Sequence, residues 1–452
     1  MIALGEIAAI CDGAVLGEDT LINPEAFIDS RTVVTGGLFC AFRGENSDGH
    51  DHVAAALAAG AGAALVDHPL DDARPLVVVD DVQRAMGVLA AEHVARLREN
   101  LTVIAVTGSV GKTTTKDLLA AVLPDPTVVT RSSFNNEIGL PLTALRATRE
   151  TRQLVLEMGA DKAGDIAYLT SLVAPDISVV LAVARAHLGV FGGIEKVAEA
   201  KAEIIHGLRP GGVSVLNADD HRVAAMAAVA PGRVVRFGRL ADDLDVTATD
   251  VELDETGRAR FVLRAGEESA LVHLGLVGEH HVSNALAAAA VAHVLGTPLR
   301  DVAHALSGRA ASSPHRMAVT TREDDITVVD DAYNANPDSM AAALRSLTAI
   351  ARGRRTVAVV GAMLELGDAE EEEHAALGRL AADLRIDLLV TVGTIAARAA
   401  DEMPSGGTRR CADLAEARRV LTAELRAGDV VLFKASNGSQ VWRLADEWAG
   451  AR

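Results

Sequence analysis

The stretch from Gly108 to Thr113 reads GSVGKT and combines two glycines with a lysine and two hydroxyl side chains. An apolar run precedes it and a helical pattern follows it, which predicts a turn between a strand and a helix. Backbone N–H groups at such a turn point into one concavity and bind phosphate oxygens. The spacing G-x-x-G-K-T is shorter than that of the common phosphate loop, whose first glycine would fall at Val106. The turn predicts a nucleotide polyphosphate site, and a turn that only caps a helix is the alternative.

Three residues at or near this turn have the chemistry to hold phosphates and a metal ion. Lys112 supplies a point charge to the β- and γ-phosphates of ATP, and the Thr113 hydroxyl is a ligand for Mg²⁺. Glu157 ends the strand-like run LVLEMG. Because the carboxyl ends of parallel strands line one crevice, Glu157 is predicted to face the same Mg²⁺ as Thr113. A solvated strand-end glutamate is the alternative.

Two polar residues farther along the chain are also candidates for the site. His187 lies in VARAHLG at the end of a strand-like run, and Lys201 lies in the helical pattern EAKAEII. Histidine is a common metal ligand, although a single histidine usually has another role. A lysine on a helix is usually exposed and paired with a neighbouring glutamate. The residue types alone leave both alternatives open for both positions.

The apolar runs around these residues predict the elements that position them. From residue 101 to 312, and again from about 314, strand-like runs such as ISVVLAVA and RTVAVVGAML alternate with helical segments. Alternation of this kind favours parallel sheets with helices on both faces. Residues 242–266 alternate in character and predict antiparallel strands or hairpins. The acidic run AEEEEH at 369–374 is predicted to begin a solvated helix.

The length of 452 residues predicts about three domains. We predict an α/β fold with a small α/β domain over residues 1–82, which comes first. A central P-loop-type domain with a mostly parallel sheet is expected over 83–312, and a Rossmann-like α/β domain over 313–452.

Composition argues against several classes of function. The net charge of −19 disfavours nucleic-acid binding, which normally requires a basic face. No window reaches the ~18 consecutive apolar residues of a membrane span, and the first residues lack the basic flank of a secretory signal. The three cysteines, Cys11, Cys40 and Cys411, are scattered and odd in number. They predict a reducing cytoplasm and no metal cluster.

Motifs in all three predicted domains then appear in the order typical of one family. Residues 29–52, DSRTVVTGGLFCAFRGENSDGHDH, are similar to a uridine-nucleotide-binding segment. The central domain continues with TGSVGKTTTKD, SFNNEIGLPLT, LEMGADKAGDI and AKAEI, and the third with DDAYNANPDSM and MLELG. The chain resembles the Mur ligases of peptidoglycan synthesis, and most of all the branch that joins D-alanyl-D-alanine to UDP-N-acetylmuramoyl-tripeptide. Folylpolyglutamate synthetases share the glycine turn but usually lack the DSR segment.

The resemblance implies an ATP-dependent, ADP-forming peptide ligase that works through an acyl phosphate. It implies that His187 and a carbamylated Lys201 hold a second Mg²⁺, beside a first Mg²⁺ held by Thr113 and Glu157. Lys112, His187 and Lys201 are then the catalytic residues. The implied ATP-binding residues are Gly108, Ser109, Gly111, Lys112, Thr113, Thr114, Asn284, Arg316 and Asp331. The implied substrate-binding residues are Ser30, Arg31, Asn135, Asn136, Asn334 and Asn336.

Five residues depart from the family pattern. The family has Asn where this chain has Ala182 and His281, and Glu where it has Gly189. It has Asp in place of Ala362 and Arg in place of Asn437. Loss of these polar groups leaves three alternatives open. The chain is expected to be the D-alanyl-D-alanine ligase, a ligase for another carboxylate and amine, or a nucleotide-binding protein without turnover. In each case we expect a cytoplasmic monomer.

Overall fold

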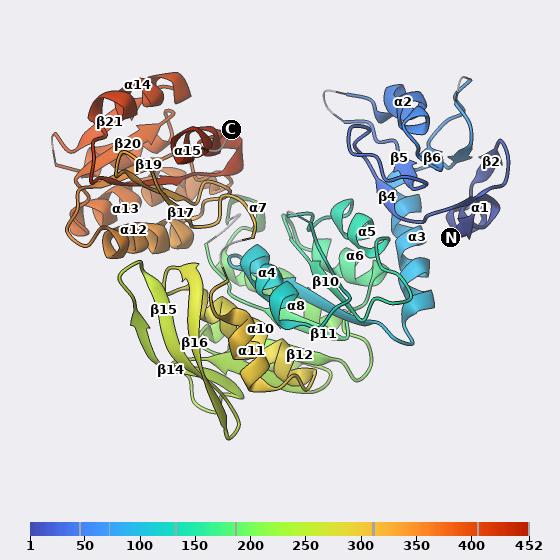
Figure 1. The fold of residues 1–452 in the computed structure, drawn as a ribbon, viewed down its shortest axis with the longest axis horizontal. Helices are drawn as coiled ribbons and strands as arrows, with labels where there is room; N and C mark the ends of the chain where they lie inside the picture. Colours follow the sequence, from blue (N-terminus) through green and yellow to red (C-terminus); the bar gives the residue numbers. More distant parts are fainter. Residues whose placement is uncertain are drawn as a thin grey trace.

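Short runs of Val, Ile, Leu and Ala form the strands of three larger sheets, because such side chains suit strands that are buried on both faces. The structure is a computed structural model that describes residues 1–44, 47–71, 73–131, 133–185, 188–309, 312–404 and 406–450. Within these residues the larger sheets contain five, nine and six strands. Figure 1 shows the first domain (blue) and the third (orange to red) on the same side of the second. The predicted three-domain α/β fold is confirmed.

The first domain is built on the five-stranded sheet, in the order β2-β7-β6-β5-β4. Strands β4 to β7 are mutually parallel where they pair, so their carboxyl ends lie at one edge. Its elements are β1 (Ile2–Ala3), α1 (Leu4–Cys11), β2 (Ala14–Leu16), β3 (Leu21–Ile22), β4 (Ala26–Phe27), β5 (Leu38–Cys40), η1 (Gly49–His52), α2 (Val53–Ala58), β6 (Ala63–Val66) and β7 (Leu76–Val78).

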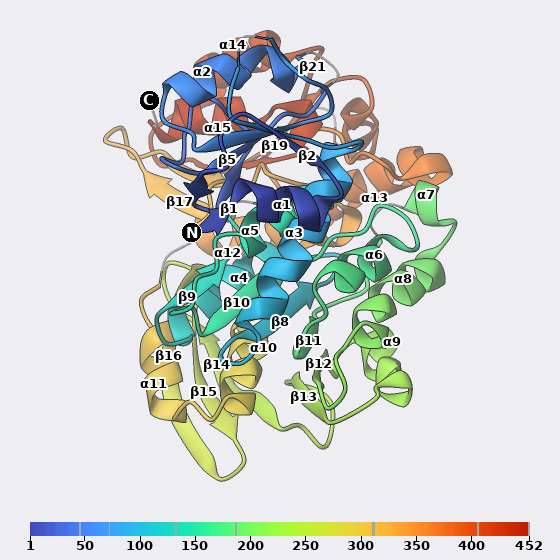
Figure 2. The ribbon, with the colours of Figure 1, turned by 90° about the vertical axis from the view of Figure 1, so that its right-hand side faces the viewer.

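Helix α3 (Val82–Leu97) connects the first domain to the second. The Asp81 carboxylate accepts a hydrogen bond from the backbone N–H of Arg84 and caps the start of this helix, as aspartate commonly does. The buried face of α3 belongs to a hydrophobic core that includes residues of both domains. Figure 2 shows α3 extending from the first domain onto the second.

The second domain is built on the nine-stranded sheet, in the order β16-β15-β14-β13-β12-β11-β8-β10-β9. Its elements are β8 (Thr102–Thr107), α4 (Lys112–Val122), β9 (Thr127–Val129), α5 (Gly139–Ala144), β10 (Gln153–Glu157), α6 (Asp165–Leu172), β11 (Ile177–Val180), α7 (Leu188–Phe191), α8 (Ile194–His206), β12 (Val213–Asn217), α9 (His221–Ala225), η2 (Met226–Val229), β13 (Val234–Gly238), β14 (Val246–Leu253), β15 (Arg258–Ala265), β16 (Glu268–Val277), α10 (His281–Val294) and α11 (Leu299–Leu306).

The register of this sheet brings three loops together at one edge. Strand β8 lies between β10 and β11 and is parallel to both, with Glu157 opposite Val106 and Val180 opposite Thr107. The glycine turn after β8, the Glu157 carboxylate and the segment that follows β11 therefore leave the sheet side by side. The predicted hairpins of residues 242–266 are confirmed, since β14 and β15 pair antiparallel.

The third domain is built on the six-stranded sheet, in the order β17-β18-β22-β19-β20-β21, with β17 as an antiparallel edge strand. Helix α12 begins at Pro337, and Asn336 before it and Ser339 after it form a capping box. The elements are β17 (Ala318–Thr321), β18 (Thr327–Asp330), α12 (Pro337–Ala351), β19 (Thr356–Val360), η3 (Gly367–Ala369), α13 (Glu370–Asp383), β20 (Leu388–Val392), η4 (Ala396–Glu402), β21 (Thr408–Cys411), α14 (Leu414–Glu424), β22 (Val430–Lys434), η5 (Asn437–Ser439) and α15 (Trp442–Ala449).

Within the described ranges, none of the helices combines the length and the apolar character of a membrane span.

Candidate active site

The glycine turn after β8 has the conformation that a phosphate site needs. Gly108 and Gly111 both have positive φ, +155° and +84°, a region that glycine adopts without steric penalty. Lys112 is the first residue of α4, and its Nζ donates to the carbonyl of Gly108 at 2.7 Å. Burial lowers the pKa of the Lys112 ammonium, although the Glu157 carboxylate opposes the shift. A poorly hydrated ammonium in this position gains from contact with phosphate oxygens.

The two predicted ligands of the first Mg²⁺ are in direct contact. The Thr113 hydroxyl lies 3.1 Å from Glu157 Oε2, and both side chains are buried. Asn135 Nδ2 donates to the other oxygen of the same carboxylate at 3.2 Å. Hydroxyl and carboxylate oxygens are the hard ligands that Mg²⁺ prefers, so the donors fit this ion.

Lys201 is buried on α8, and His187 lies outside the described residues. The Lys201 side chain is 3% exposed and lines the same cavity as Lys112. Burial, and secondly the charge of Lys112, lower the pKa of Lys201 to about 7. An amine with this pKa is partly neutral at neutral pH, which is the state that carbamylation requires.

A cavity of about 720 Å³ lies beside the glycine turn on the side of Lys201. Asn136 lines it, but the Asn136 Oδ1 atom also accepts hydrogen bonds from the backbone N–H groups of Ile138 and Gly139 and so holds the start of α5. The lining residues are Gln83, Gly108, Ser109, Lys112, Asn135, Asn136, Glu137, Gly159, Ala160, Asp161, Lys162, Ala163, Gly164, Asp165, Tyr168, Leu169, Lys201 and Asn334.

A second cavity, of about 300 Å³, also borders the glycine turn and is lined by residues of the second and third domains. It contains Ser109, Thr114, Asn284, Arg316 and Asp331, all predicted ATP contacts. Helix α10 packs against α4 and so brings Asn284 to the turn, whereas Arg316 and Asp331 come from the third domain.

The Asn284 side chain is held from two sides within this cavity. Its Oδ1 accepts from the Thr115 hydroxyl at 3.4 Å, and its Nδ2 lies 3.1 Å from His281 Nδ1. His281, which stands where the family has Asn, therefore orients Asn284 in this chain. Burial holds the pKa of His281 well below its ordinary value, so the ring is neutral.

Arg316 and Asp331 bring the third domain to the glycine turn. Arg316 donates to the Thr113 hydroxyl at 3.1 Å, and its guanidinium lies 4.2 Å from the centre of the Tyr333 ring. The Asp331 carboxylate accepts from Lys434 Nζ at 2.6 Å. Lys434, at the end of β22, is not among the residues predicted from the sequence, although Asn437, which departs from the family pattern, lies only three residues later.

A third cavity, of about 430 Å³, is lined mainly by the third domain. Asn334 lines all three cavities, whereas the Asn336 side chain is used to cap α12. The lining residues are Asp161, Tyr333, Asn334, Ala335, Asn336, Leu364, Glu365, Ser436, Asn437 and Gly438.

Three other departures from the family pattern have a structural counterpart. A Cβ atom on Gly189 would lie 2.7 Å from the backbone nitrogen of Gly367 in the third domain, closer than real Cβ atoms approach. The carbonyl of Ala182 accepts from the backbone N–H of Ser109 at 2.9 Å, and Ala182 lines the 300 Å³ cavity. The Ala362 carbonyl accepts from the N–H of Ser436 at 3.0 Å.

The first-domain candidates lie at the carboxyl edge of their sheet, in the loop after β4. Arg31 is exposed, and its guanidinium donates hydrogen bonds to the Asp29 carboxylate. These hydrogen bonds lower the pKa of Asp29 to about 2. Ser30 lies between them in the same turn.

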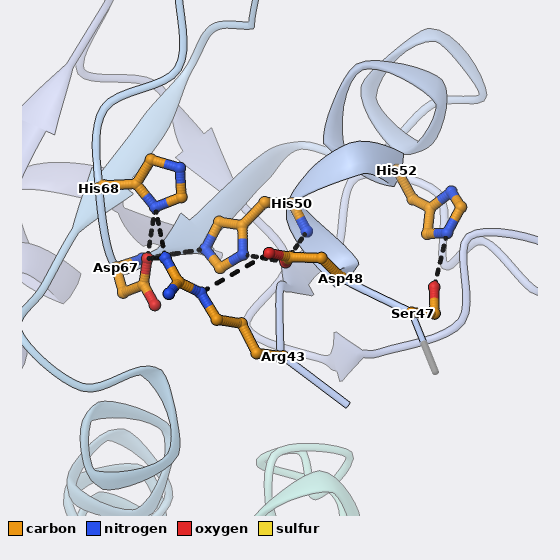
Figure 3. A network of polar contacts seen from close by, with 7 residues as sticks. All are labelled: Arg43, Ser47, Asp48, His50, His52, Asp67 and His68. Carbon is orange, nitrogen blue, oxygen red and sulfur yellow. Dashed lines mark hydrogen bonds and ion pairs between the residues drawn. The ribbon is translucent and has the colours of Figure 1, made fainter. Parts of the chain in front are cut away.

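Figure 3 shows a polar network in the loops after β5 and β6, which leave the same edge. His50 Nδ1 lies 2.6 Å from Asp48, and His50 Nε2 accepts from the backbone N–H of Asp67 at 3.2 Å. The Arg43 guanidinium lies 3.3 Å from Asp67 and also approaches His68. Both nitrogens of His50 are therefore engaged, and a cation already lies among the carboxylates, which does not fit a metal site. The sequence stretch GENSDGHDH contains Asp48 and His50, but it does not reveal that Asp67 and His68 lie beside them (Figure 3).

Comparison with known proteins places these features in a family. The model of the Mur ligase middle domain matches residues 106–292, that of the Mur ligase glutamate ligase domain matches 315–437, and that of the Mur ligase family catalytic domain matches 26–100.

Relatives and solved structures match over nearly the whole chain. The UDP-N-acetylmuramoyl-tripeptide–D-alanyl-D-alanine ligase of Mycobacterium bovis is 43% identical, over 98% of this chain and 97% of its own. The Escherichia coli ligase of the same name is 38% identical, over 87% and 86%. A crystal structure of MurF from Acinetobacter baumannii has a TM-score of 0.86 at 33% identity and covers 99% of this chain and 98% of its own. MurF ligase from Thermotoga maritima in complex with ADP has a TM-score of 0.80 at 29% identity, over 95% and 97%.

Proposed function

The chain belongs to the Mur ligase family, and we propose that it joins D-alanyl-D-alanine to UDP-N-acetylmuramoyl-tripeptide with conversion of ATP to ADP and inorganic phosphate. The observation that carries this proposal is that two cavities border one glycine turn, with Lys112 and Lys201 on the wall of the larger, and that a third cavity shares Asn334 with both. Relatives of the same name, aligned over nearly the full length of the chain, support the choice of substrates.

The reaction proceeds in two steps that both move negative charge onto oxygen atoms. The peptide carboxylate attacks the γ-phosphate of ATP, and the products are an acyl phosphate and ADP. The amine of the dipeptide then attacks the acyl carbon, and inorganic phosphate leaves. Lys112 and Arg316 supply fixed positive charge at the transferred phosphoryl group. The third domain covers the site and excludes the water that would hydrolyse the acyl phosphate.

The enzyme uses Mg²⁺, and the oxygen donors of Thr113 and Glu157 suit that ion. A bound Mg²⁺ neutralises charge on the β- and γ-phosphates. We assign to Lys201 the role of a carbamate whose oxygens add anionic donors for a second Mg²⁺, together with His187. The supporting observation is the burial of the Lys201 amine and its pKa of about 7.

Each cavity receives one part of the substrates in this proposal. ATP occupies the glycine turn, with its base and ribose in the 300 Å³ cavity near Asn284 and Asp331. The tripeptide enters the 720 Å³ cavity, and D-alanyl-D-alanine enters the 430 Å³ cavity of the third domain. The uridine diphosphate binds the first domain, at the carboxyl edge that carries Ser30, Arg31 and Arg43. We retain residues 1–82, 83–312 and 313–452 as the three domains.

A cytoplasmic monomer suits this chemistry. The three cysteines are free thiols, which suits a reducing compartment.

The test is phosphate release from ATP with UDP-N-acetylmuramoyl-tripeptide, with and without D-alanyl-D-alanine. We expect release to require both substrates and to yield the extended peptide. Lys112→Ala should lower the rate by at least ~100-fold at an unchanged melting temperature, because its side chain faces the ligand. Lys196→Ala, at an exposed lysine, should leave the rate unchanged.

The two alternative functions give different results in this assay. Release that depends on another amine would assign the same chemistry to a different acceptor. Nucleotide binding without release under any of these conditions would indicate a binding protein. Either result contradicts the proposed function.

A further inference from the structure

One arginine of the second domain is bound to two elements of the third. Arg185 lies in the segment that leaves the carboxyl end of β11. Its Nη1 donates to both oxygens of Glu373 at 2.8 and 3.0 Å, and its Nη2 donates to Asp338 Oδ1 at 3.1 Å. The backbone N–H of Arg185 donates to Asp338 Oδ2 at 2.9 Å. Four hydrogen bonds from a single residue therefore cross from one domain to the other.

The same segment is fixed to the glycine turn. The Ser109 hydroxyl accepts from the backbone N–H of Ala184 at 3.0 Å and lies 3.3 Å from the Ala184 carbonyl. The backbone N–H of Ser109 donates to the Ala182 carbonyl at 2.9 Å. Arg185 is thus attached on one side to the phosphate-binding turn and on the other to the third domain.

A second contact lies a few residues farther on. The backbone N–H of Gly189, in α7, donates to the carbonyl of Glu365 at 3.2 Å, and Gly189 packs against Gly367. Figures 1 and 2 both show α7 beside the third domain. The close approach leaves no room for the glutamate that the family commonly has at this position.

Both contacts lie next to the 430 Å³ cavity. Asp338 stands in the first turn of α12 and lines the 300 Å³ cavity, and Asn336, two residues earlier, caps the helix and lines both that cavity and the 430 Å³ one. Glu365 lines it as well. The contacts of Arg185 and Gly189 therefore also hold in place the residues of α12 and of the Glu365 segment that line the cavities.

We propose that Arg185 is a positioning residue that holds the third domain over the second and thereby assembles the cavity for the amine substrate. The assignment of that cavity rests on the proposed function, whereas the interdomain contact does not. Glu373 is only 12% exposed, and its carboxylate accepts charge-assisted hydrogen bonds from Arg185 Nη1, which are stronger than bonds between neutral groups. Asp338 and Arg185 are about two-fifths exposed. Their charges are readily hydrated on separation, so the contact can form and break in each catalytic cycle.

The first experiment compares Arg185→Ala with Arg222→Ala. Arg222 also donates two hydrogen bonds to one glutamate, Glu195, but both residues belong to the second domain. We expect Arg185→Ala to lower kcat/KM for D-alanyl-D-alanine by about 10-fold and to change KM for ATP by less than about twofold. Arg222→Ala should leave both values unchanged. A loss for ATP in Arg185→Ala that is as large as the loss for D-alanyl-D-alanine would overturn the proposal.

The second experiment measures closure without turnover. Small-angle X-ray scattering with ADP and Mg²⁺ should show a larger mean radius of gyration for Arg185→Ala than for the wild type and for Arg222→Ala. In a double-mutant cycle, Arg185→Ala combined with Glu373→Gln should be no worse than the more impaired of the two single variants, because both remove the same contact. Additive losses, or wild-type scattering from a folded Arg185→Ala protein, would refute the role. If the wild type lacks ligase activity, the proposed function fails, and scattering still decides on the contact.

Discussion

Two lysines of helix α8 illustrate how surroundings decide the chemistry of a residue. Lys196 is exposed and forms an ion pair with Glu199 at 2.6 Å. Lys201, on the same helix, is buried, and its surroundings lower its pKa from 10.5 to about 7. Lys112 disfavours the charged form of Lys201, while Asp161, Glu203 and Asp165 favour it. At neutral pH Lys201 therefore has a substantial neutral fraction.

This difference predicts a pH-dependent carbamate on Lys201. The neutral amine reacts with CO₂, and its fraction rises as the pH increases through about 7. At constant dissolved ¹³CO₂ we expect a carbamate ¹³C signal that is weak at pH 6 and strong at pH 8. Lys201→Ala should lose the signal and most of the ligase rate, and a small carboxylic acid in solution should restore part of that rate.

Lys196→Ala is the matched control and should retain both the signal and the rate. A signal of equal intensity in Lys201→Ala, or full activity of that variant, would exclude the carbamate at this position.

The turn between β8 and α4 depends on a backbone conformation and on close packing. Gly111 has φ +84°, and a Cβ atom there would overlap with Asn284 Oδ1. The phosphate-binding turn can therefore pack against Asn284 of α10 only because Gly111 has no side chain.

We predict that Gly111→Ala weakens ADP binding by at least about 10-fold and lowers the free energy of unfolding by about 1–2 kcal/mol, because alanine is strained at positive φ. Calorimetry with ADP and Mg²⁺ and chemical denaturation measure the two effects. At Gly407, the atoms nearest to an added Cβ lie at 3.5 Å or more, and φ is not in the positive region. Gly407→Ala should therefore change neither quantity, and ADP affinity in Gly111→Ala equal to the wild type would contradict the coupling.

At the scale of the whole molecule, the sites are distributed over domains that make separate contributions. The first domain presents Ser30 and Arg31 at the carboxyl edge of its own sheet, and the glycine turn lies at the carboxyl edge of another. Substitutions at sites without shared partners usually act independently. Binding of the uridine part and of the nucleotide should therefore be separable.

We expect Ser30→Ala combined with Arg31→Ala to weaken the binding of UDP-N-acetylmuramoyl-tripeptide and to leave ADP binding unchanged in calorimetry. The exposed Arg31 has its charge available to a diphosphate once Asp29 releases it. Arg96→Ala, which removes an arginine paired with Glu6 and Glu92, is the control and should bind both ligands normally. Unaltered affinity of the double variant for the UDP substrate would remove Ser30 and Arg31 from the site.

The sequence by itself determined the fold class, the hairpins of the second domain and the family, because these depend on local patterns and on the order of motifs along the chain. It also predicted that Thr113 and Glu157 lie together, since parallel strands end at one edge. The acidic run at 369–374 was expected to be solvated, and Glu370 does begin α13. Only the tertiary structure brought Glu373 of that run to Arg185, 188 residues away. The pKa of Lys201 and the packing of Gly189 on Gly367 were likewise decided by the tertiary structure, because burial and contact depend on distant segments that no local pattern encodes.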